Sequence, residues 1–198
     1  MTQHSTGRIN QKRRTRTAIL RAATELLRDG GQVTMREIAR EALVSEATAY
    51  RYFPDLPTLL REAVAGQLFD PVEALRPVER SPDPVVRVAT AAEYLLRHVL
   101  AHEGAVRAMI AATITRPADA TARPGLRFGL IEQSLAPPAE LNGLDGDALA
   151  QLKRDLSVVV SAEALFGLLD QHRLTPEQAV ASLARIAITL TRETLDRS

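Results

Sequence analysis

A run of small and hydrogen-bonding residues lies in the first third of the chain. Ser45, Ala47 and Thr48 follow one another closely, and none of them is bulky. A helix that carries such residues in its first turn can approach the edges of DNA bases, where hydroxyl groups bond to base atoms and methyl groups contact thymine. These residue types and their spacing therefore predict base recognition rather than catalysis.

Two tyrosines continue this run. The phenol hydroxyls of Tyr50 and Tyr52 can reach phosphates while their rings pack against the same domain. Tyr50 lies about 200° around a helix from Thr48, so we expect it to contact the flanking phosphate rather than a base. The alternative for both tyrosines is simple packing beside Phe53.

Two short helices are needed to position these side chains. Thr34 and Glu37 form the pattern of a capping box, so a helix is expected to start at Thr34. Ser45 can cap a second helix over residues 46–52, and Pro54 stops it. Two short helices joined by a tight turn are the outline of a helix-turn-helix, which places its second helix in the major groove of DNA.

Charge is distributed unevenly along the 198 residues, whose net charge is +1. Residues 1–53 carry a net charge of +5, and residues 54–198 carry −4. The densest basic run includes Arg13, Arg14 and Arg16. A basic segment on a mildly acidic body predicts an anionic partner, and the alternative is a solvated, fraying terminus.

Two segments together resemble the signature of TetR-family transcriptional regulators. They are TMREIA, residues 34–39, and VSEATAYRYF, residues 44–53, within a match that spans about residues 16–60. The resemblance implies a helix-turn-helix DNA-binding domain followed by a divergent helical domain. This chain departs from the family pattern at Leu43, where a glycine is usual, and at Leu56, where a lysine is usual.

The resemblance also implies which residues contact DNA. Thr34 and Arg36 become backbone or base contacts, although Arg36 can equally be a solvated helix residue. The base-facing turn and the phosphate contacts are Ser45, Ala47, Thr48, Tyr50 and Tyr52. By analogy with homeodomain arms, Arg13, Arg14 and Arg16 would track phosphates while upstream residues reach the minor groove.

The whole chain is expected to be all-α, with about nine helices. A first helix over residues 16–29 precedes the helix-turn-helix, and Gly30 and Gly31 are expected to end it. The later helices are predicted over residues 55–69, 85–102, 126–135, 147–171 and 176–195, with a shorter helix between Gly104 and Thr115. We predict a DNA-binding domain over residues 1–54 and a ligand-binding and dimerisation domain over residues 55–198.

The resemblance implies a homodimer through the last two helices and a ligand pocket within the second domain. Candidate pocket residues are Phe69, Tyr94, His98, Met109, Phe128, Ile131 and Phe166. Each of them can also be an ordinary core residue. Because the candidates are mainly aliphatic and aromatic, we expect an apolar or amphipathic effector. His98 and His102 have the spacing of a metal-binding pair, but the sequence offers no third ligand, so no metal is predicted.

Composition excludes several other classes of protein. The chain has no cysteine, which removes disulfides and thiol chemistry, and no run approaches 18 consecutive apolar residues. Without a signal-peptide pattern we expect a cytoplasmic protein, and no catalytic constellation or cofactor motif is present. The sequence therefore predicts a homodimeric, ligand-responsive regulator, usually a repressor, that binds a palindromic operator. Within the same class, the alternative is an activator or a regulator controlled by a protein partner. The alternatives from other classes are a helical carrier protein that no longer reads DNA, and an enzyme on the same scaffold.

Overall fold

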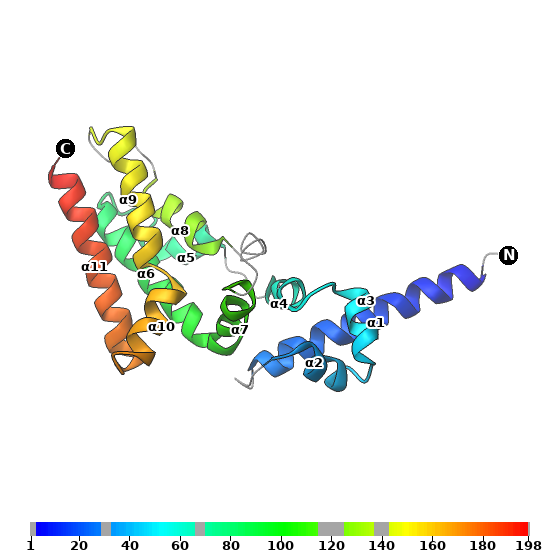
Figure 1. The fold of residues 1–198 in the computed structure, drawn as a ribbon. Helices are drawn as coiled ribbons and strands as arrows, with labels where there is room; N and C mark the ends of the chain where they lie inside the picture. Colours follow the sequence, from blue (N-terminus) through cyan, green and yellow to red (C-terminus); the bar gives the residue numbers. More distant parts are fainter. Residues whose placement is uncertain (1–2, 29–32, 66–69, 115–124, 137–142, 198) are drawn as a thin grey trace. The chain divides into compact units, whose positions relative to one another are not determined.

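Helices account for all the regular structure in the part of the chain that is described. The computed structural model describes residues 3–28, 33–65, 70–114, 125–136 and 143–197. These ranges contain eleven α-helices, one 3₁₀ helix and no strand, which confirms the all-α prediction with more helices than the nine expected (Figure 1). Within the same ranges, no helix has both the length and the hydropathy needed to cross a membrane.

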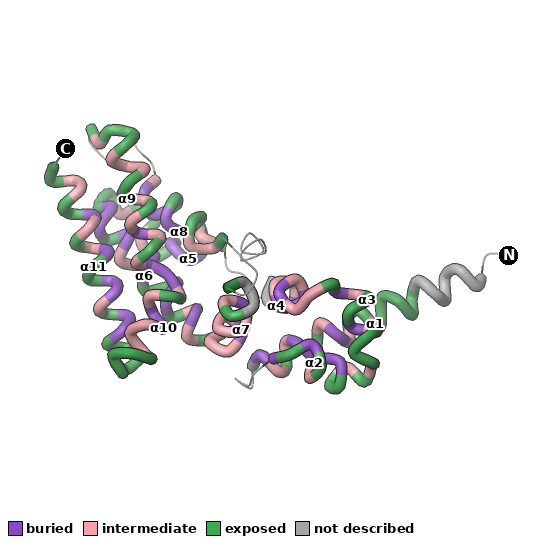
Figure 2. The backbone as a smooth tube through the Cα atoms, in the orientation of Figure 1, coloured by how far each residue is buried: buried purple, intermediate pink, exposed green. Residues whose placement is uncertain are grey.

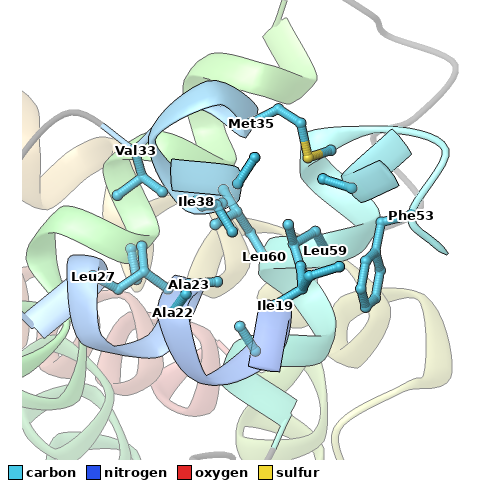
Figure 3. Close-up of a cluster of buried hydrophobic side chains, with 14 of the residues drawn as sticks. Ile19, Ala22, Ala23, Leu27, Val33, Met35, Ile38, Phe53, Leu59 and Leu60 are labelled. Carbon is cyan, nitrogen blue, oxygen red and sulfur yellow. The ribbon is translucent and has the colours of Figure 1, made fainter. Parts of the chain in front are cut away.

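The chain divides into two compact units, of which the first contains the helix-turn-helix. Its helices are α1 (Gln3–Arg28), α2 (Met35–Glu41), α3 (Glu46–Tyr52), α4 (Leu56–Ala65) and α7 (Glu103–Ile114). Helix α1 packs against α2, α4 and α7, while α2 packs against α3. Figure 3 shows the shared core, to which Ile19, Ile38, Phe53, Leu59 and Leu60 contribute fully buried side chains.

The expected caps of the short helices are confirmed. The Thr34 hydroxyl accepts the Glu37 N–H at 3.2 Å, and the Glu37 carboxylate accepts the Thr34 N–H at 2.9 Å. The Ser45 hydroxyl accepts the Thr48 N–H at 3.2 Å and so starts α3. These bonds satisfy N–H groups that a helix terminus otherwise leaves without partners.

The start predicted for the first helix, at Arg16, is wrong, because α1 already begins at Gln3. Among residues 10–27, whose burial is described, the first buried residue is nonetheless Ile19, so residues 10–18 precede the buried part of α1. The glycines expected to end this helix, Gly30 and Gly31, lie outside the described residues.

The second unit is built around two long helices. Its elements are α5 (Pro71–Leu75), η1 (Arg76–Val78), α6 (Pro84–Ala101), α8 (Leu126–Ser134), α9 (Gly146–Val159), α10 (Ala162–Asp170) and α11 (Pro176–Asp196). Helix α11 packs along α6 and also contacts α9 and α10, and α8 packs on α5, α6 and α9. Buried positions follow both α6 and α11 in Figure 2. A capping box of Thr175 and Gln178 starts α11.

The single helix predicted over residues 147–171 is wrong. The chain leaves the helical conformation at Val160 (ψ 68°) and Ser161 (φ −142°), which separates α9 from α10. The Ser161 hydroxyl accepts the Ala164 N–H at 3.1 Å and donates to the Val158 carbonyl at 2.7 Å. A serine cap that follows three valines explains the break, since β-branched residues favour a helix less than most others do.

The compact units do not coincide with the boundary predicted after residue 54. Helices α4 and α7 both belong to the first unit, where they pack against each other. The predicted helix over residues 55–69 is described only as far as Ala65, and a new short helix, α5, is capped by Asp70. The Asp70 carboxylate accepts the Val72 N–H at 2.9 Å.

Leu43 occupies the left-handed region in the turn between α2 and α3, with φ +55°. Its N–H donates to the Arg40 carbonyl and the Val44 N–H donates to the Ala39 carbonyl, which is the bonding of a Schellman turn. Glycine usually takes this position because a side chain there strains the backbone. Leu43 is 92% exposed, so packing of its side chain does little to offset the energy cost of that strain.

Replacing Leu43 by glycine should therefore stabilise the protein. Relief of the strain is worth about 1–2 kcal/mol, and the added chain entropy of glycine returns about 0.5–1 kcal/mol. We expect the free energy of unfolding, measured by urea denaturation, to rise by up to about 1 kcal/mol in Leu43→Gly. Leu43→Ala keeps the strain and is the matched control. A Leu43→Gly protein no more stable than Leu43→Ala would contradict this account.

Candidate nucleic-acid interface

Helix α3 is held at both of its ends. Ser45 caps its start, and at its end the Phe53 N–H donates to the Ala49 carbonyl at 3.0 Å. Phe53 is only 1% exposed and Ala49 is fully buried, so one side of α3 is committed to the core. The opposite side is consequently presented to solvent in a fixed orientation.

The exposed face of α3 consists of Glu46, Ala47, Tyr50 and Arg51. Positions i, i+1, i+4 and i+5 share one side of a helix, so these four side chains form a continuous surface. We call this surface the α3 face. Tyr50 is 48% exposed and belongs to it together with Ala47. Tyr50 therefore shares this face with Ala47, while Thr48, from which Tyr50 is expected to point away, is not part of it.

Thr48 and Tyr52 border the α3 face rather than occupying it. Both are half-buried, and the Thr48 hydroxyl lies 2.9 Å from that of Ser45. Tyr52 packs against the hydrophobic core, as the alternative interpretation of the tyrosines anticipates, whereas Tyr50 does not. Base reading by Thr48 stays a prediction, with its hydroxyl already engaged by Ser45.

Arg51 is a candidate contact that the sequence analysis did not single out. Its guanidinium carbon lies 5.7 Å from the centre of the Tyr52 ring, and the side chain is exposed at the last turn of α3. A cation four positions after Ala47 was the available signal, because that spacing returns to the same side of the helix. On α2, Thr34 and Arg36 are exposed, and Thr34 is occupied by its capping box.

The basic residues Arg13, Arg14 and Arg16 all lie in α1, within a continuous helix. An α-helix is about 10–12 Å wide with its side chains, and the minor groove is about 6 Å wide. A helical segment therefore cannot enter that groove as an extended arm does. Arg13 and Arg14 are exposed, but Arg16 forms an ion pair with Glu62 of α4 and stacks on Phe53.

The predicted pocket residues are divided between the two units, with Met109 in the first and the other described candidates in the second. Met109 belongs to the core of the first unit, and Ile131 and Phe166 are buried in the second. Tyr94 and Phe128 are exposed and His98 is half-buried, while Phe69 lies outside the described residues. As core residues, the three buried side chains follow the alternative interpretation.

A cavity of about 580 Å³ lies between α9 and α11. Its lining residues are Gly143, Asp145, Ala148, Gln151, Leu152, Asp155, Leu190, Glu193, Thr194 and Arg197. None of the described candidates for the pocket is among them. The lining combines an apolar part, including Leu152 and Leu190, with several charged groups.

The described residues offer no cluster for a metal ion. No group of three or more His, Cys, Asp or Glu side chains is placed to hold one within those ranges. Helix α6 ends at Ala101, so His98 lies on it while His102 lies beyond its end. The two histidines therefore do not share one helix.

Comparison with known proteins agrees with the geometry of the first unit. Residues 19–63 match the family of bacterial regulatory proteins, tetR family. The chain is also similar to a solved structure, a TetR transcriptional regulator from Rhodococcus sp. RHA1, with 22% sequence identity and a TM-score of 0.60. That likeness covers 91% of this chain and 97% of the other, and at this identity it shows a common fold. No curated protein is similar enough to match.

The Ser45 cap should contribute to the stability of the protein. Ser45→Ala removes the acceptor of the Thr48 N–H, so we expect the free energy of unfolding to fall by about 1 kcal/mol. Ser45→Asp keeps a good capping group and should retain wild-type stability, which circular dichroism during urea unfolding can measure. Equal loss in both variants would show that the cap does not fix α3.

Proposed function

We propose that this protein, whose residues 19–63 form a TetR-family DNA-binding domain, is a homodimeric transcriptional repressor that a small molecule releases from its operator. The observation that carries the proposal is the exposed α3 face on a helix held at both ends. In a helix-turn-helix, the second helix lies in the major groove with its first residues at the base edges. An acting repressor would work in the cytoplasm, where bacterial DNA lies.

The DNA contacts that we propose divide into two groups. Ser45, Ala47 and Thr48 are at the start of α3 and would meet base edges. The phosphate contacts that we propose are Arg13, Arg14, Thr34, Arg36, Tyr50, Arg51 and Tyr52. Exposure of these side chains supports the assignment for all except Tyr52, which is half-buried and would present only its hydroxyl.

The dimer that we propose forms through the last two helices, α10 and α11, together with the end of α9. Two exposed apolar side chains support it, Ile186 on α11 (40% exposed) and Val158 near the end of α9 (70% exposed). A two-fold dimer presents two recognition helices to two half-sites, and this geometry calls for a palindromic operator.

The effector that we propose is a small amphipathic molecule. The cavity between α9 and α11 supports this class, because its volume suits a small molecule and its lining pairs Leu152 and Leu190 with Asp155 and Glu193. Release from DNA requires that the effector favour a conformation that cannot span two half-sites.

Selection of operators from a randomised DNA pool tests the proposal directly. We expect the wild type to enrich a palindrome and Thr48→Ala to change the preference at one position in each half-site. The change should amount to about 1–3 kcal/mol per half-site. Tyr50→Phe should weaken binding to all sequences alike. Arg21→Gln, an exposed change on the same domain, is the control.

Two results would contradict these assignments. If Tyr50→Phe changed base preference and Thr48→Ala did not, α3 would lie in the groove with a different face forward. If the wild type enriched no sequence and failed to retard the DNA upstream of its own gene in a gel, the function as a regulator would be refuted and that of a carrier protein favoured.

The proposed dimer has its own test. Ile186→Asp would place a charge without a partner in the apolar interface, so light scattering at micromolar concentration should show the 21.6 kDa monomer. The wild type should have twice that mass. Val72→Asp, an exposed apolar position on α5, should leave the dimer intact. A monomeric wild type, or a dimeric Ile186→Asp protein, would refute the interface.

A further inference from the structure

Arg16 connects three parts of the first unit through one side chain. It extends from α1, its guanidinium carbon lies 5.0 Å from the centre of the Phe53 ring, and it pairs with the Glu62 carboxylate of α4. We infer that Arg16 is a positioning residue, which promotes operator binding by holding α3 and α4 on α1, and not a phosphate contact. This inference rests on the DNA-binding function proposed above.

Glu62 and Phe53 already contact the guanidinium group of Arg16 that a phosphate would have to bind. The carboxylate of Glu62 accepts a guanidinium N–H, and the ring of Phe53 covers part of the guanidinium plane. A phosphate that approached Arg16 would also approach the negative charge of Glu62. Arg16 is exposed like Arg13 and Arg14 on the same helix, so its contacts with Glu62 and Phe53, and not its burial, distinguish it from them.

Phe53 is the residue through which Arg16 reaches α3. It ends that helix, is 1% exposed, and closes the last turn with its N–H on the Ala49 carbonyl. The guanidinium therefore stacks on the one ring that anchors the end of the recognition helix to the core, and cation–π contacts of this kind favour a fixed ring orientation.

Glu62 is the residue through which Arg16 reaches α4. Only three residues separate α3 from α4, and Asp55 caps α4 by accepting the Thr58 N–H at 2.7 Å. A weaker polar contact also joins α1 to α4: the Thr24 hydroxyl, which donates to the Leu20 carbonyl at 3.0 Å, lies 3.4 Å from the Ala63 carbonyl. Arg16 therefore supplies the stronger of these two side-chain links between α1 and α4.

The chain supplies a matched control for this ion pair. Arg21 and Glu25 form a pair within α1, with 3.7 Å between guanidinium nitrogen and carboxylate oxygen. That pair has the same chemistry and lies on the same helix, but it links no second helix. Removing it changes the charge of α1 without releasing α3 or α4.

The test compares the affinity of full-length variants for the operator that the wild type selects, at several salt concentrations. The variants are Arg16→Gln, Glu62→Gln, the double mutant, Arg21→Gln and Glu25→Gln. If Arg16 positions α3 and α4, Glu62→Gln weakens binding as Arg16→Gln does, by about two- to fivefold per protomer, the range of a partly exposed ion pair. The double mutant is then no weaker than either single one, and the dependence on salt stays that of the wild type.

The opposite assignment predicts a change of opposite sign for Glu62→Gln. If Arg16 contacted a phosphate, Glu62→Gln would free it and strengthen binding, and Arg16→Gln would lower the salt dependence by about 0.9 per contact. That result, or effects no larger than those of the Arg21 and Glu25 variants, would overturn the inference while leaving the DNA-binding proposal intact. A folded wild type, verified by circular dichroism, that selects no operator would instead refute the proposed function, and the inference with it.

Discussion

Burial of Phe53 is the interaction on which the recognition helix depends. Helix α3 has only seven residues, fewer than the roughly 12–15 that an isolated helix needs to be stable in water. Its conformation therefore comes from the Ser45 cap at one end and from Phe53 at the other, inside a core that α1, α2 and α4 share. The α3 face owes its orientation to residues that never reach the surface.

Local signals in the sequence were sufficient for the parts of the fold that are fixed within a few residues. The caps at Thr34, Ser45 and Thr175 were predictable because each hydroxyl bonds to a backbone N–H only three positions ahead. The two helices of the helix-turn-helix and the long last helix were predictable for the same reason. Ser161 is also such a cap, but it lies inside an apolar run whose period continues across it, so the break between α9 and α10 was missed.

Contacts between distant residues could not be predicted in this way. Arg16 and Glu62 are 46 positions apart, and nothing in the basic run distinguished Arg16 from its exposed neighbours Arg13 and Arg14. The burial of the pocket candidates could not be predicted for a related reason. Ile131 and Phe128 are both large and apolar and lie three positions apart on α8, yet one is buried and the other exposed, and only tertiary packing decides between them.

Helix α1 is continuous, but its two halves are stabilised differently. From Arg16 onward it is held by contacts with the rest of the first unit, whereas residues 10–15 have no buried side chain and include the like charges of Lys12, Arg13 and Arg14. Repulsion between those charges opposes helix formation, and a polyanion relieves it. Amide hydrogens of residues 10–15 should therefore exchange with solvent far faster than those after Ile19, and bound nucleic acid should slow that exchange. The helix content of the first turns of α1 therefore depends on the surrounding ions, which screen the repulsion, as well as on the sequence.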